Sequence, residues 1–71
     1  MSHTALDRVA GTVTAFDDER GLGEIYANGV TVPFHCVSIA DGTRTIVIGC
    51  TVTFVLLSKL GRREAGDIRR S

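Results

Sequence analysis

The sequence predicts a small all-β domain from its composition, its turn spacing and one hairpin signal. The chain has 71 residues and is 44% hydrophobic, with 6% aromatic residues and a single proline. Val, Ile and Thr are frequent among its residues, and β-branched side chains favour strands. Turn residues recur at the close spacing that is typical of small β domains. The dipeptide Asn28-Gly29 is the strongest hairpin signal, because both residues tolerate a positive φ.

The N-terminal half is expected to form three strands. The first covers about 8–16, and its bulky apolar side chains are Val9, Val13 and Phe16. The polar run 17–21 ends on glycine, which is typical of a turn. The second and third strands cover about 22–27 and 30–36, on either side of the hairpin dipeptide.

The C-terminal half is expected to form two more strands after an irregular connection. A short helical turn at 37–40 and a loop at 41–44 lead into a fourth strand at about 46–57. Its inward alternating side chains are Val52, Phe54 and Leu56. A turn at 59–61 then leads into a fifth strand at about 62–69.

Five short strands in one domain over residues 1–71 favour a closed or nearly closed antiparallel barrel, which removes exposed sheet edges. The OB-type barrel is the preferred architecture, and a small SH3-like barrel is the alternative. The predicted interior contains Val13, Ile25, Val32, Phe34, Val52 and Phe54. The same alternation points Glu24, Pro33 and His35 to the outer face.

The charges balance in total but are segregated along the chain. The formal net charge is zero, which is unusual for a general nucleic-acid binder. Residues 7–24 carry five acidic and two basic side chains, whereas residues 59–71 carry five basic and two acidic ones. An anion should therefore prefer the C-terminal end. The candidate anion patch consists of Arg62, Arg63, Arg69 and Arg70.

Other residues predict neither a membrane segment nor a metal, cofactor or catalytic site. No apolar run approaches the roughly 20 residues that span a membrane, and no export signal is seen, so a cytoplasmic protein is expected. Cys36 and Cys50 are interpreted as small, largely buried hydrophobes, and His3 as part of a frayed tail. The acidic run 17–19 is interpreted as a turn, and scattered Ser residues with one internal His make no triad, so neither an enzyme nor a small-molecule substrate is expected.

Three ordered segments resemble the motifs of the cold-shock domain family. The family's G-x-V-K-W-F-N-x-x-K-G-F-G-F-I reads here Gly11-Thr-Val-Thr-Ala-Phe-Asp-Asp-Glu-Arg-Gly-Leu-Gly-Glu-Ile25. Its V-F-V-H-F reads Val32-Pro-Phe-His-Cys36, and a later G-F-R-T-L-x-x-G-x-x-V-x-F reads Gly42-Thr-Arg-Thr-Ile-Val-Ile-Gly-Cys-Thr-Val-Thr-Phe54. The resemblance covers about residues 9–70 with nearly unbroken spacing, and it implies a cold-shock barrel.

The resemblance also implies a platform of aromatic rings that stack the bases of single-stranded RNA or DNA. Here most of the matching positions carry no ring, namely Ala15, Leu22, Glu24, Pro33, Cys36 and Thr43, and Thr14 replaces a basic residue. The candidate nucleic-acid-binding residues are Phe16, Arg20, Leu22 and His35.

Two functions follow as hypotheses. The first is weak binding of single-stranded RNA or DNA by the depleted platform, with an RNA-chaperone or regulatory role. The alternative is a degenerate barrel that binds a protein partner and has lost significant nucleic-acid binding. Each stacked base contributes on the order of 1–3 kcal/mol, so the missing rings should lower affinity markedly.

Overall fold

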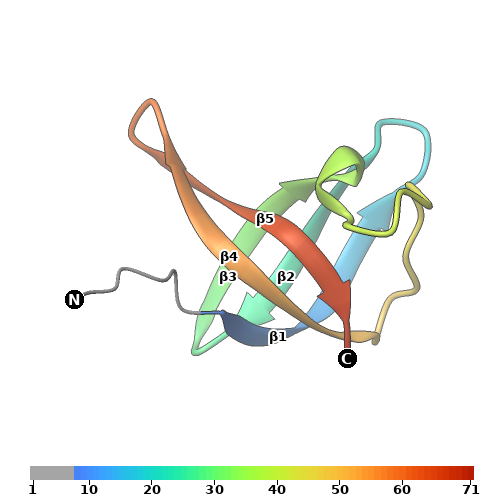
Figure 1. Ribbon diagram of the computed structural model, residues 1–71, viewed down its shortest axis with the longest axis horizontal. Coiled ribbons are helices and arrows are strands. Elements are labelled where there is room, and N and C mark those ends of the chain that lie inside the picture. Colours follow the sequence, from blue (N-terminus) through green and yellow to red (C-terminus); the bar gives the residue numbers. More distant parts are fainter. Residues whose placement is uncertain (1–7) are drawn as a thin grey trace.

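The computed structural model describes residues 8–71, with the side chain of Lys59 left aside, and this part of the chain is all-β (Figure 1). Its elements are β1 (Val9–Asp17), β2 (Leu22–Ala27), β3 (Val30–His35), the 3-10 helix η1 (Cys36–Ser38), β4 (Thr51–Lys59) and β5 (Arg62–Arg70). The strands form one antiparallel sheet in the order β3-β2-β1-β4-β5. The prediction of an all-β domain with five antiparallel strands is confirmed.

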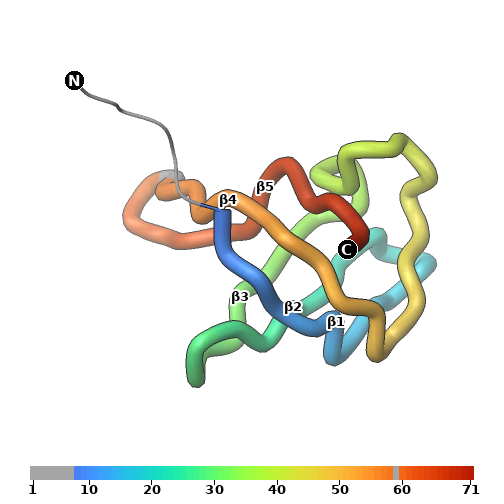
Figure 2. Tube along the Cα trace, turned by 60° about the horizontal axis from the view of Figure 1, so that its bottom comes forward, coloured from blue at the N-terminus to red at the C-terminus, as the bar shows by residue number. Residues whose placement is uncertain are grey.

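The sheet curls, but its hydrogen bonding does not close into a barrel. Strands β3 and β5 are the two edges of the sheet. Within residues 8–71, an isolated parallel bridge joins Ile39, which follows η1, to Ile68 of β5. The Ala40 N–H donates to the Ile68 carbonyl at 2.8 Å, so the chain after η1 lies against β5 (Figure 2).

The two turns of the N-terminal half have the predicted local chemistry. Asn28 and Gly29 adopt φ values of 51° and 80°, as the two-residue connection between β2 and β3 requires. In the turn between β1 and β2, one carboxylate oxygen of Asp17 accepts from the backbone N–H groups of Glu19 and Arg20, at 3.0 and 3.3 Å. These bonds satisfy turn amides that the strands leave unpaired.

A bulge in β1 places Phe16 toward the interior. Val13 pairs with Ile25, but Ala15 already pairs with Glu24, so β1 contains one extra residue between these pairs. Phe16 consequently lies opposite Gly23, on the side of the sheet that carries the core.

The glycine at this position allows two aromatic rings to meet. Gly23 pairs with Phe16 on one side and with Phe34 on the other. The two rings stack with centroids 6.0 Å apart and planes 9° from parallel. A Cβ atom at Gly23 would lie 2.6 Å from Cε1 of Phe34, so a larger residue would push the rings apart. Glycine therefore serves close packing here.

The fourth strand begins later than predicted. The expected range was 46–57, but β4 starts at Thr51, because residues 47–50 form a turn in which the Cys50 N–H donates to the Val47 carbonyl at 3.1 Å. The turn bonds to β1: the Val13 N–H donates to the Cys50 carbonyl at 3.0 Å. Ile46 is nevertheless buried in the core.

The limits of two other elements differ slightly from the prediction. The helical turn expected at 37–40 is a 3-10 turn at Cys36–Ser38. The fifth strand, expected at 62–69, continues to Arg70 and contains a bulge at Asp67, whose φ is 47°. His3 lies outside the described residues.

The predicted core is confirmed at all six positions. Each is at most 5% exposed: Val13, Ile25, Val32, Phe34, Val52 and Phe54. The structure adds Ala27, Ile39, Ile46, Ala65 and Ile68. Leu56, also expected inside, is 38% exposed because the hairpin of β4 and β5 extends beyond the body of the domain (Figure 1). Cys36 and Cys50 are free and only partly buried, and both pack against the core.

Candidate functional site

The outer face of β1, β2 and β3 carries three transverse rows of side chains. The strand registers define them as Asp17–Leu22–His35, Ala15–Glu24–Pro33 and Thr12–Tyr26–Thr31. Every member is exposed except the half-buried Ala15. The predicted outward orientation of Glu24, Pro33 and His35 is confirmed.

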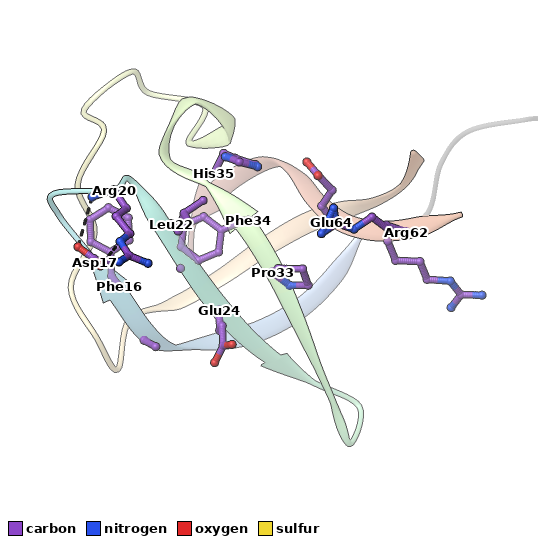
Figure 3. Close-up of a pocket in the computed structure, with 13 residues that line it drawn as sticks. Phe16, Asp17, Arg20, Leu22, Glu24, Pro33, Phe34, His35, Arg62 and Glu64 are labelled. Carbon is purple, nitrogen blue, oxygen red and sulfur yellow. Dashed lines mark hydrogen bonds and ion pairs between the residues drawn. The ribbon is translucent and has the colours of Figure 1, made fainter. Parts of the chain in front are cut away.

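A groove of about 660 Å³ lies over the first two rows and reaches the start of β5 (Figure 3). Its lining residues are Ala15, Phe16, Asp17, Arg20, Leu22, Gly23, Glu24, Pro33, Phe34, His35, Arg62, Arg63 and Glu64. All four predicted nucleic-acid-binding residues are among them. Two of the four predicted patch arginines also line the groove, from a strand that is distant in sequence but adjacent to β3 in space.

The predicted anion patch is divided between the two ends of β5. Arg62 and Arg63 begin the strand, and Arg69 and Arg70 end it, so the pairs are separated by about seven residues or roughly 23 Å. The four arginines therefore do not form one continuous patch, and anion binding by either pair stays a prediction. Arg69 forms an ion pair with Asp67 at 3.3 Å.

Arg70 holds the loop that follows η1. Its guanidinium forms an ion pair with Asp41, and it donates to the Thr45 carbonyl at 2.7 Å and to the Thr43 hydroxyl at 3.2 Å. The Thr43 backbone N–H donates to Asp41 at 3.0 Å. Bonds from the backbone and hydroxyl of Thr43, together with the charge of Arg70, lower the pKa of Asp41. Arg70 therefore stabilises the loop that follows η1.

A second ion-pair cluster lies near the bulge in β5. Arg8 donates to the Asp67 carboxylate at 2.8 Å and to the Asp67 carbonyl at 2.6 Å. The hydrogen bond from Arg8, followed by the charge of Arg69, lowers the pKa of Asp67. Neither cluster lines the groove.

Opposite charges balance within the groove. Asp17, Glu24 and Glu64 supply the carboxylates, and Arg20, Arg62 and Arg63 supply the guanidinium groups. Arg20 and Asp17 lie 3.8 Å apart and are both largely exposed, so their pairing is weak and breaks readily for a ligand (Figure 3). A polyanion therefore meets both attraction and repulsion here.

The surface offers limited area for stacking. Phe16 is half-buried, and its ring lies against Phe34, so only part of it faces the groove. Leu22 is 41% exposed. Tyr26, which was not predicted as a site residue, is 52% exposed on the same face beyond the groove. Its alternation with Leu22 and Glu24 along β2 is the signal that could have identified it.

Two specific features are not found in the described part of the chain, a metal-ion cluster and a membrane-spanning helix. Among residues 8–71, no three His, Cys, Asp or Glu side chains are close enough together to hold a metal ion. None of the described segments is a helix with the length and hydrophobicity to cross a membrane.

No family model matches the chain, and the search of curated proteins finds no match.

Proposed function

We propose that this chain is a cold-shock-type protein that binds single-stranded RNA or DNA weakly, through the groove on β1–β3 and β5. The observation that carries the proposal is the convergence of residues in this groove. Phe16, Arg20, Leu22 and His35 were predicted from sequence motifs, and they line the groove together with two arginines that were predicted separately from charge.

The sheet topology is compatible with an OB-type barrel. OB-folds are five-stranded, partly open barrels that bind nucleic acid on the face of strands 2 and 3. Here β2 and β3 carry the exposed rows, and the parallel bridge between Ile39 and Ile68 lies where β3 ends and β5 runs past it. The open edge therefore does not count against this architecture.

The proposed binding mode separates bases from phosphates. Bases rest on the apolar and ring surfaces of Leu22, Pro33 and His35, while Arg62 and Arg63 attract phosphates from the β5 side. Few rings remain to stack, and Glu24 repels phosphate. We expect dissociation constants above about 1 μM, equivalent to binding weaker than about 8 kcal/mol.

A salt-dependent titration tests this proposal with a matched control. Fluorescence anisotropy of a labelled single-stranded oligonucleotide is measured between low and moderate salt. Arg62→Gln with Arg63→Gln should weaken binding and reduce the slope of log K against log salt by about 1.4, because each lost phosphate contact on a single strand contributes about 0.7. Arg44→Gln with Arg69→Gln removes the same charge outside the groove and should leave binding nearly unchanged.

The alternative, a protein-interaction module, is favoured by one observation: the groove is lined by three carboxylates and three guanidinium groups. Such a mixed surface suits a partner that presents both charges. If no oligonucleotide binds even at low salt, the nucleic-acid proposal fails and this alternative replaces it.

A further inference from the structure

Glu24 lies at the centre of the candidate surface, in the middle row of exposed side chains. Across the sheet it pairs with Ala15 and Pro33, neither of which has a side chain that can donate a hydrogen bond. Along β2 its outward neighbours are Leu22 and Tyr26. Within residues 8–71, with the side chain of Lys59 left aside, no hydrogen bond or ion pair to its carboxylate is found, and Figure 3 shows it apart from the Arg20–Asp17 pair.

A carboxylate in this position selects among bases by their donors. An ionised carboxylate only accepts hydrogen bonds, and its two oxygens can accept two parallel bonds. Guanine presents two adjacent donors on its Watson–Crick edge, N1–H and the N2 amine. Cytosine and adenine present one amine there, and thymine or uracil presents one N3–H. Unpaired bases on single strands are read on this edge.

The neighbours of Glu24 leave space for a base to approach it. Ala15 and Pro33 are compact, so no long side chain of the same row stands between the carboxylate and the solvent. Leu22 and Tyr26, both exposed, flank Glu24 along the strand and can support the adjacent bases. A phosphate at this point would be repelled, so a bound strand must turn a base toward the carboxylate.

We propose that Glu24 reads guanine, so that the chain prefers guanine-containing single strands over pyrimidine tracts. This inference rests on the proposed nucleic-acid function. Glu24 stands where the cold-shock resemblance implies a stacking ring, and its carboxylate can hydrogen-bond a base instead. Bidentate contacts between a side chain and a base typically discriminate by about tenfold or more.

The experiment compares labelled heptamers of thymidine in which only the central base varies: thymine, cytosine, adenine, guanine or hypoxanthine. Binding is measured by anisotropy at low salt. The guanine heptamer should bind about tenfold more tightly than the thymine heptamer. Hypoxanthine, which lacks the N2 amine, should fall between them.

Variants separate base reading from simple charge. Glu24→Gln keeps the shape of the side chain but loses one acceptor, and it should reduce the guanine preference to less than about twofold. Glu19→Gln makes the same chemical change in the β1–β2 turn, outside the groove, and should preserve the preference. Circular dichroism confirms that both variants are folded.

Each of the remaining outcomes overturns the guanine inference, and one of them also overturns the proposed function. Equal binding of all five heptamers overturns the guanine inference but leaves the proposed function standing. An equal gain for all five heptamers in Glu24→Gln, with their relative affinities unchanged, also overturns it, because Glu24 would then act only as a charge that repels phosphate. A guanine preference that survives in Glu24→Gln assigns base reading to another residue. Absence of binding to every heptamer overturns both proposals.

Discussion

The two faces of β1–β3 differ in packing and in exposure to solvent. The inner face is closely packed, with the rings of Phe16 and Phe34 stacked across Gly23 and the Phe34 side chain 1% exposed. The outer face of the same strands carries two exposed carboxylates, at Asp17 and Glu24, an exposed proline, and the exposed side chains of Tyr26 and His35. Residues that alternate along one strand therefore serve different purposes: the inner set provides stability, and the outer set is available for binding.

The largest effect that would test this contrast is expected on the inner face. Phe34→Ala should lower the free energy of unfolding by about 3–5 kcal/mol, because it removes a buried ring and leaves a cavity beside Phe16. A domain of this size has a total stability of only about 4–10 kcal/mol. Urea unfolding followed by circular dichroism measures the change.

The adjacent residue provides the control. Pro33 precedes Phe34 in β3 but is exposed on the outer face. Pro33→Ala should change the free energy of unfolding by no more than about 1 kcal/mol, as exposed substitutions usually do. If the two variants lost similar amounts of unfolding free energy, the inner face would not be the main source of stability.

The second effect is expected on the outer face and in affinity. Ala15→Trp with Leu22→Phe and Glu24→Phe should strengthen binding of a pyrimidine oligonucleotide at least tenfold. Three added rings could contribute roughly 3–9 kcal/mol, and tenfold requires only about 1.4 kcal/mol. The margin allows for imperfect stacking beside Pro33, which pairs with Glu24.

The triple variant must retain the fold for the comparison to hold. Its unfolding midpoint in urea should stay close to that of the parent, because two of the three positions are exposed and Ala15 is half-buried. A folded variant that binds no better than the parent would mean that the outer face is no longer a nucleic-acid surface, and the protein-interaction alternative would take precedence.

Alternation and turn chemistry were enough to predict the inner face from the sequence. Val13, Ile25, Val32 and Phe34 recur at alternating positions, and the short turns between the strands fix their registers. The register change in β1 was not predictable in this way, because a bulge inserts one residue without a clear compositional mark. The position of Phe16 opposite Gly23 depends on that bulge.

The four arginines of β5 show why the site was predicted only in part. Both pairs are adjacent dipeptides in one strand, and local sequence does not distinguish them. Their roles depend on partners that are distant in sequence: Arg70 meets Asp41, whereas Arg62 and Arg63 meet the groove beside β3. Charge counting identified the basic segment, but it could not assign either pair to structure or to binding.

The smallest effect is expected where charge supports the fold, at the end of β5 and away from both faces. The pKa of Asp41 lies below its ordinary value of 3.8, chiefly through the backbone N–H and hydroxyl of Thr43 and then through Arg70. A lowered pKa in the folded state means that the ionised carboxylate stabilises the fold above about pH 4 and that this contribution is lost as the pH falls through the lower folded value.

Asp41→Asn should therefore have a lower melting temperature than the parent at pH 6, and the difference in melting temperature should narrow toward pH 3. Arg70→Gln leaves the Thr43 bonds in place, so it should keep more of the pH dependence than Asp41→Asn. Melting curves of the three proteins from pH 6 to pH 3 provide the measurement. A constant gap between the parent and Asp41→Asn would show that the carboxylate contributes nothing that depends on its ionisation, and equal loss of pH dependence in Arg70→Gln would assign the effect to the ion pair instead of the Thr43 bonds.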